Sequence, residues 1–446
     1  MQPIFLREPG RSGTKCPPNG VRDRATRAEH ACDMTAAGES PVPTTTGPLD
    51  EVHRAQSARL LDHLVVHGPA TRSELATATG LGRGTIAGLT SRLLDAGVLR
   101  PGGSAASGDG RAAPLALTAA DRVLVTATLT PDDAVAAVAT LGGDEIARFV
   151  EPLIPVDGVA ADPLELLALV LTRAVARAQR GEHPVADLTV LVDGAVVGRP
   201  AVVVTDARLG SEPVDVLGAL RILAPTVAEL EPRLSLPITL LPTATAAALA
   251  EHAELPGIDE LLFIAGDDSV TAAAISGGRP LTGAHGLAAT FAHLPVVPGG
   301  ARCTCGQQGC LTTVAAPELV LERAGLSEFA AANGRTAALS ELVERVAAAD
   351  DRARWSWLDA AHWIGRALQL VVPTLDPSAV IVGGYWGVLL GDVDAAFRAN
   401  RPTIGGGALE AIPTLAPARL GHGAVFAGAR RQARERLVAE PSLLAG

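Results

Sequence analysis

Residues 291–311 read FAHLPVVPGGARCTCGQQGCL, and they hold three of the five cysteines of this 446-residue chain within eight positions. Three thiolates this close, in a loop whose two glycines let it fold back, suit tetrahedral zinc. A histidine ten residues before the first cysteine is the candidate fourth ligand. Four protein ligands leave no position for water, so we predict a structural zinc site, with free thiols or an oxidised pair as the alternatives. The predicted ligands are His293, Cys303, Cys305 and Cys310.

Composition and charge narrow the class of protein. Hydrophobic residues make up 48% of the chain and charged residues 19%, which excludes a mostly disordered protein. The net charge is -11, yet residues 51–118 hold seven arginines and only five acidic residues. A slightly basic segment on an acidic body fits a protein whose anion contacts are confined to one place. No apolar run is long enough to span a membrane and no signal pattern opens the chain, so we expect a cytoplasmic protein.

Residues 1–50 have no hydrophobic period and are rich in Pro, Thr, Gly and Arg. We expect them to form a disordered tail. Met34 lies just before the structured part and is an alternative to Met1 as the start of translation. Cys16 and Cys32 carry no function in this interpretation.

Residues 51–118 have the element order of a winged helix-turn-helix. A first helix ends at Gly68-Pro69, and the segment TRSE, from Thr71 to Glu74, is a capping box that begins a second helix. A glycine-bearing turn at 80–82 leads to a third helix over about 83–96. Two short strands around a glycine-rich loop follow and would form the wing. The third helix of such a unit presents its N-terminal residues to the major groove of DNA.

Arginine is the main candidate for DNA contacts in this unit. Arg83 and Thr85 stand at the start of the third helix, and Arg92 faces away from its apolar stripe. An arginine can fork onto a guanine edge or onto phosphate, and one on the wing can enter the minor groove or touch phosphate. The alternative is a small interaction domain with solvated arginines. The candidate DNA-binding residues are Arg72, Ser73, Arg83, Thr85, Arg92 and Arg111.

Beyond residue 118 strands and helices alternate, which predicts an α/β body of two lobes. Residues 291–311 resemble the signature of the ROK family (repressors, open reading frames and sugar kinases), G-E-x-G-H followed by C-x-C-G-x-x-G-C-L-E. The resemblance covers about residues 52–440 and implies a two-lobed, actin-like ATPase fold with sugar bound in the cleft. With a winged helix in front, the chain resembles the family's regulators of the xylose- and N-acetylglucosamine-repressor type. We expect a tail over 1–50, a winged helix-turn-helix over 51–118 and a ROK domain over 119–446, with lobes of about 119–246 and 247–446.

The departures from the family's kinases concern catalysis. Their first strand carries D-x-G-G-T, where residues 125–130 here read VTATLT. Their catalytic aspartate, in E-N-D-A-N, corresponds to Thr243, which cannot act as a general base near pH 7. Their phosphate loop G-x-G-I-G corresponds to residues 265–269, AGDDS, whose two carboxylates would repel ATP. These departures from the family's kinases therefore imply that the body is catalytically inactive.

The sugar-binding positions are altered as well. The glutamates, asparagine and aspartate that hold sugar hydroxyls in the family correspond here to Thr290, Thr312, Pro242 and Thr243, and only His293 is kept. Buried hydroxyls are recognised by paired polar groups, so the loss removes most of the specificity. A sugar effector, another small effector and no effector all stay open. The candidate effector residues are Thr243, Thr290, His293 and Thr312.

We therefore predict a DNA-binding transcriptional regulator, a repressor, whose zinc-bearing ROK domain serves oligomerisation and possible effector sensing. Two-fold pairing predicts a homodimer or tetramer on an inverted repeat of double-stranded DNA. The alternatives are an active sugar kinase with a fused regulatory head and a protein-binding scaffold.

Overall fold

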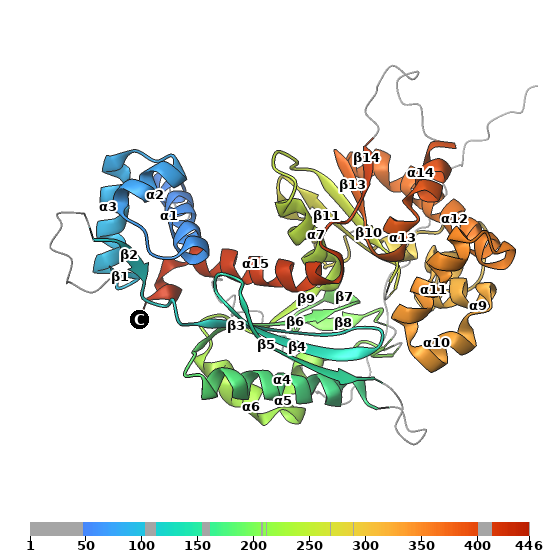
Figure 1. Ribbon diagram of the computed structural model, residues 1–446, viewed down its shortest axis with the longest axis horizontal. Helices are drawn as coiled ribbons and strands as arrows, with labels where there is room; N and C mark the ends of the chain where they lie inside the picture. The colour runs from blue at the N-terminus through green and yellow to red at the C-terminus, as the bar shows by residue number, and fades with distance from the viewer. Residues whose placement is uncertain are drawn as a thin grey trace, which may run out of the picture. The chain divides into compact units, whose positions relative to one another are not determined.

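The computed structural model describes residues 48–102, 113–153, 161–206, 208–210, 212–267, 269–288, 290–399 and 413–445 (Figure 1). Cys16, Cys32, Met34 and the expected wing residue Arg111 lie outside these ranges, so the predictions made for them stay predictions. Among the helices of the described ranges, none is both long and apolar enough to cross a membrane.

Three helices and a small sheet open the described chain. They are α1 (Pro48–His67), α2 (Arg72–Thr79), α3 (Arg83–Asp95), β1 (Leu99–Pro101) and β2 (Leu115–Leu117). The predicted capping box is confirmed: the Thr71 N–H donates to Glu74 Oε2 at 2.8 Å, and the Glu74 N–H donates to Thr71 Oγ1 at 3.3 Å. Gly80 then adopts a φ of 68°, which ends α2 and turns the chain into α3. The strands β1 and β2 pair antiparallel.

The hydrophobic core of these helices continues into the body. Leu61 of α1 and Leu89 of α3 belong to the same buried cluster as Leu124 of β3 (Val123–Leu129) and Leu437 of α15 (Ala424–Ala439). An ion pair of 2.8 Å between Asp62 and Arg434 also joins α1 to α15. The N-terminal helices therefore share a packed interface with the last long helix.

The first large sheet has the strand order β5-β4-β3-β6-β9. Strands β3, β6 and β9 run parallel, while β4 and β5 form an antiparallel edge. Helices α4, α5 and α6 cover one face, and α15 crosses the other (Figure 1). Every residue of β3 is buried, as expected for a strand covered on both faces. The elements are β4 (Asp133–Thr140), β5 (Glu145–Pro152), α4 (Pro163–Arg180), β6 (Val185–Val192), β7 (Ala195–Val197), β8 (Val202–Val204), α5 (Val216–Leu223), α6 (Pro225–Leu230) and β9 (Thr239–Pro242).

The second large sheet, β12-β11-β10-β13-β14, repeats this arrangement. Along β10, Leu261 and Phe263 pack toward α7, whereas Leu262 and Ile264 pack toward α12, because successive side chains of a strand point to opposite faces. The elements are α7 (Thr243–Ala253), β10 (Leu261–Ala265), β11 (Thr271–Ser276), β12 (Arg279–Pro280), α8 (Thr312–Ala315), α9 (Pro317–Ala324), α10 (Ser327–Asn333), α11 (Arg335–Ala347), α12 (Asp351–Leu375), β13 (Ala379–Val382), α13 (Gly384–Val388), α14 (Leu390–Ala399) and β14 (Thr414–Pro417).

In each sheet an antiparallel three-strand edge is followed by two parallel strands in the same spatial order. Ligands of such sheets bind beyond the carboxyl ends of the parallel strands. In this molecule those ends are followed by Asp193 after β6, Thr243 after β9, Gly266 after β10 and Gly383 after β13. The fold thus brings four loops from two sheets toward one cleft.

Candidate functional site

The four predicted metal ligands converge. One ligand atom from each of His293, Cys303, Cys305 and Cys310 lies within 4.8 Å of the others. Cys303 Sγ is 3.5 Å from His293 Nδ1, and Cys305 Sγ is 3.6 Å from Cys310 Sγ. Three sulfurs and one imidazole nitrogen in this arrangement can bind a metal ion, and the donor set fits zinc.

The backbone of the loop forces this convergence. Gly309 adopts a φ of 72°, and a Cβ at this position would collide with the Val297 carbonyl oxygen. The Val296 and Val297 N–H groups both donate to the Gly309 carbonyl, at 2.9 and 3.0 Å. Burial and the neighbouring thiols raise the pKa of Cys310 to about 12. This thiol therefore ionises at neutral pH only if a nearby cation offsets its charge, as a zinc ion would.

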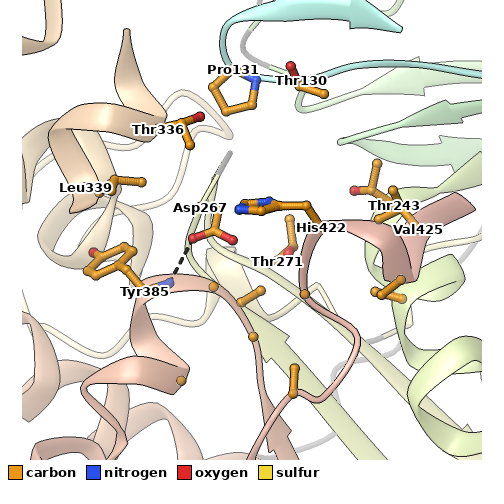
Figure 2. A pocket seen from close by; sticks show the side chains of 18 of the residues that line it. Thr130, Pro131, Thr243, Asp267, Thr271, Thr336, Leu339, Tyr385, His422 and Val425 are labelled. Atoms are coloured by element: carbon orange, nitrogen blue, oxygen red, sulfur yellow. Dashed lines mark hydrogen bonds between the residues drawn. The ribbon is translucent and has the colours of Figure 1, made fainter. Parts of the chain in front are cut away.

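Two cavities adjoin each other in the body. The first, of about 950 Å³, is lined by Thr130 and Pro131 from the β3–β4 turn, by Thr336 of α11 and by Asp267 and His422 (Figure 2). The second, of about 1080 Å³, is bordered by His293 and Cys305 of the candidate metal site. Both volumes are ample for a small molecule.

The structure divides the four expected effector residues between these cavities. Thr290, His293 and Thr312 line the second cavity together. Thr243 lines the first, and its side chain is only 8% exposed. Three of the four residues therefore line the second cavity, and Thr243 is linked to that cavity only by its hydrogen bond to a neighbouring residue.

That neighbour is Asp193, which the sequence analysis missed. Its carboxylate lines both cavities and accepts a hydrogen bond of 3.1 Å from Thr243 Oγ1. Arg208 lies 3.8 Å from Asp193 and 3.3 Å from Asp206. Burial raises the pKa of Asp193, against the pull of the Arg208 charge. The available signal was an aspartate directly after a buried parallel strand, at the edge of the sheet where ligands bind.

The side of the cleft expected to hold phosphate is filled by the chain itself. Asp267 accepts a hydrogen bond of 2.9 Å from the Tyr385 N–H at the start of α13. Its carboxylate lies so close to Gly384 that a Cβ there would overlap it. The indole of Trp386 packs directly on Gly266 and is fully buried. An anionic phosphate would have to displace a carboxylate from this position.

The expected DNA-binding residues of the described chain lie on α2 and α3. Ser73, Arg83, Thr85 and Arg92 are exposed. Arg72 is exposed too, but its Nε donates to Thr90 Oγ1 at 3.0 Å, which ties α2 to α3. Arg100 on β1 is a further exposed arginine beside these helices, which the sequence analysis passed over.

Two mixed sheets of the same strand order, a ligand-sized cleft and a Cys3His loop define the class of two-lobed sugar-kinase-like proteins. Residues 165–435, more than half of the chain, match the ROK family. The protein belongs to the ROK family.

N-acetylmannosamine kinases are among the curated relatives of this chain. N-acetylmannosamine kinase of Escherichia coli (strain SE11) is 33% identical over 168 residues, which cover 37% of this chain and 56% of the kinase. The chain thus spans little more than half the length of the first curated relatives it matches. A second N-acetylmannosamine kinase, from Escherichia coli (strain SMS-3-5 / SECEC), is 29% identical over 252 residues, 56% of this chain and 83% of the kinase.

Solved structures show the same fold. A crystal structure of a ROK family transcriptional regulator, a homolog of the E. coli MLC protein, matches with a TM-score of 0.64 at 20% identity, covering 89% of this chain and all of that one. A ROK family glucokinase from Streptomyces griseus, in complex with glucose and AMPPNP, matches with a TM-score of 0.53 at 26% identity. It covers 70% of this chain and 99% of the glucokinase.

Proposed function

We propose that this protein is a DNA-binding transcriptional regulator, a repressor, whose ROK body does not catalyse phosphoryl transfer. The observation that carries the proposal is the exposed face of α3, with Arg83 and Thr85 at its start and Arg92 near its end. This helix follows α2 across a turn at a left-handed glycine and precedes a two-stranded sheet, the element order of a winged helix-turn-helix.

The extent of the fold matches supports this assignment. The glucokinase accounts for 70% of the chain, whereas the regulator accounts for 89%. The regulator's fold therefore has counterparts for elements that the kinase lacks. We propose residues 51–118 as the DNA-binding domain and 119–446 as the ROK domain, with Arg72, Ser73, Arg83, Thr85, Arg92 and Arg111 as the DNA contacts.

Loss of kinase activity is proposed from the contents of the cleft. Thr243 cannot accept a proton from a sugar hydroxyl near pH 7, and its own hydroxyl is donated to Asp193. Asp267 occupies the backbone donor at the start of α13. A nucleotide would therefore meet a carboxylate where it needs a donor.

The remaining parts of the proposal follow from this role. A structural zinc ion held by His293, Cys303, Cys305 and Cys310 would fasten the loop that borders the second cavity. Thr243, Thr290, His293 and Thr312 are the proposed effector contacts, and whether the effector is a sugar stays open. A homodimer or tetramer in the cytoplasm would place two α3 helices on an inverted repeat.

The test is DNA binding by the full chain to its own promoter region. Arg83→Ala should weaken specific binding by about 1–3 kcal/mol if Arg83 contacts a base. Arg180→Ala, at the exposed end of α4, is the matched control and should change nothing. Failure of the unaltered protein to bind at low salt, where phosphate contacts are strongest, would instead favour a protein-binding scaffold.

An active sugar kinase is the second candidate, because the curated relatives are kinases and the cleft is of ligand size. A coupled assay with N-acetylmannosamine or glucose and ATP separates the two. Hexose-dependent ATP consumption by the purified chain would establish kinase activity and refute the proposal that the ROK domain is catalytically inactive.

A further inference from the structure

Helix α11 is capped by a residue from the other lobe. Its own N-cap, Gly334, offers no side chain, and no side chain of its own segment caps it. Asp132, in the β3–β4 turn, fills this role from 203 positions away: Oδ1 accepts from the Arg335 N–H at 2.7 Å. Oδ2 accepts from the Thr336 N–H at 3.0 Å and from Thr336 Oγ1 at 2.7 Å.

The two partners belong to different sheets. Asp132 sits at the tip of the hairpin formed by β3 and β4 of the first sheet, and its own carbonyl accepts from the Leu153 N–H at 2.8 Å. Helix α11 packs through Ala338 and Leu342 into the core around the second sheet. The carboxylate thus links two separately packed halves of the body.

The geometry is fitted on both sides. Gly334 has a φ of 88°, and a Cβ at this position would stand only 3.0 Å from Asp132 Oδ1, so a glycine keeps the approach open. On its own side α11 is anchored by the Arg335–Glu318 ion pair of 2.7 Å. The N–H groups of a helix's first turn have no acceptor within the helix, so they attract a carboxylate both as a hydrogen-bond acceptor and through the helix dipole.

The contact lies at the edge of the first cavity. Pro131 and Thr336, on the two sides of the contact, both line that cavity, and Figure 2 draws them near each other at its edge. Separation of the hairpin from α11 would widen the cavity at this edge.

We propose that Asp132 is an interlobe latch, which holds the two lobes together at the edge of the cleft by capping α11 from the opposite lobe. The latch sets how readily the first cavity opens, and it does not depend on whether the protein binds DNA.

The experiment compares Asp132→Ala with Asp350→Ala in the full-length protein. Asp350 is the matched control because it caps α12 through the Ala353 N–H at 2.8 Å, within one lobe. Each variant loses one capping carboxylate, so amide hydrogen exchange in the first turn of the affected helix should quicken about tenfold. Small-angle scattering should show a larger radius of gyration for Asp132→Ala and an unchanged radius for Asp350→Ala.

Thr336→Val provides a second, milder variant, because it removes only the hydroxyl donor and leaves both backbone donors in place. It should give a smaller increase in radius than Asp132→Ala. If Asp132→Ala speeds exchange in α11 while its radius of gyration equals that of the unaltered protein, Asp132 is an ordinary helix cap and the latch is refuted.

Discussion

At the scale of single residues, the four proposed zinc ligands carry the most direct prediction. Cys305 is the exposed member of the cluster, so its replacement by serine creates no cavity in a core. Cys305→Ser should release the metal and lower the melting temperature, because three remaining ligands bind zinc far more weakly and metal binding is coupled to folding. Metal analysis and thermal unfolding, with Thr304→Ser beside it as control, measure this. One metal per chain and an unmoved melting curve in Cys305→Ser would contradict the assignment.

Asp132 gives a prediction about pH. Burial raises the pKa of this carboxyl, but the hydrogen bonds from Thr336 and Arg335 outweigh it and leave the pKa lowered. A lowered folded-state pKa stabilises the protein above the unfolded-state value, near 4, and that contribution disappears as pH falls through the folded-state value. Asp133 beside it has a raised pKa, from burial and from the Asp132 charge, and protonates first.

The measurement is the difference in unfolding free energy between the unaltered protein and Asp132→Asn. This difference should be constant from about pH 7 to 5 and should shrink toward zero below about pH 3.5. The other charged groups at the contact are Asp133, Arg335 and Glu318, which both proteins keep. A difference that stays constant down to pH 2.5 would show that the Asp132 charge contributes nothing.

Single residues also show where sequence reasoning succeeds. The cysteine and histidine ligands were predictable because their spacing is local and their chemistry is narrow. Asp193 was not, because its partners Thr243 and Arg208 are 50 and 15 positions away and only the parallel pairing of β6 with β9 brings Thr243 beside it. The capping role of Asp132 could not be predicted for the same reason, because its partner Arg335 is 203 positions away and the local sequence around neither residue indicates the contact.

At the scale of elements, helix α3 contains two glycines that no packing contact in the described structure requires. Gly84, the second residue of α3, and Gly88, in its interior, are both exposed, and a Cβ at either would meet nothing within 4 Å. A glycine in a helix interior, such as Gly88, disfavours the helix by about 1 kcal/mol relative to alanine. No neighbouring group requires a glycine at either position. Without side chains there, however, α3 could approach DNA more closely if it lay in the major groove.

Gly88→Ala should therefore stabilise the protein by up to about 1 kcal/mol and yet weaken DNA binding. Gly391→Ala in α14 is the control, because this glycine is also exposed with open space around it. It should leave DNA binding unchanged, with a gain in stability no larger than that of Gly88→Ala because Gly391 is the second residue of its helix. Denaturant titration measures the stability of both variants, and gel shifts measure their DNA affinity. If Gly88→Ala binds DNA as tightly as the unaltered protein, α3 does not approach DNA closely at Gly88.

Elements were predictable where their signals are local. The capping box at Thr71 and the turn at Gly80 fixed α2 and α3 to within a residue or two. Strand β14, in contrast, lies at the edge of the second sheet and pairs with β13 across more than thirty positions. Strand β5 is half-exposed and mixed in polarity, because it is an edge strand that only β4 pairs with in the described sheet.

At the scale of the whole molecule, helix α15 connects the first cavity with the N-terminal helices proposed to bind DNA. Its first residues, Ala424 to Phe426, line the first cavity, and His422 just before it faces Asp267 there (Figure 2). Its later residues Ala433, Leu437 and Val438 pack in the core shared with α1 and α3. A helix of 16 residues transmits a displacement at one end to the other as a rigid element.

Leu437→Ala tests this connection. Leu437 is 1% exposed, so truncation should cost about 2–5 kcal/mol and loosen the joint between α15 and the N-terminal helices. If that joint holds α3 in a DNA-competent position, the variant should also lose DNA affinity at temperatures where it remains folded. Leu342→Ala, fully buried in the core of the second sheet, should cost similar stability and leave DNA affinity intact. Equal DNA affinity in the two folded variants would mean that the N-terminal helices act independently of the cleft, and that control by a ligand would need another route.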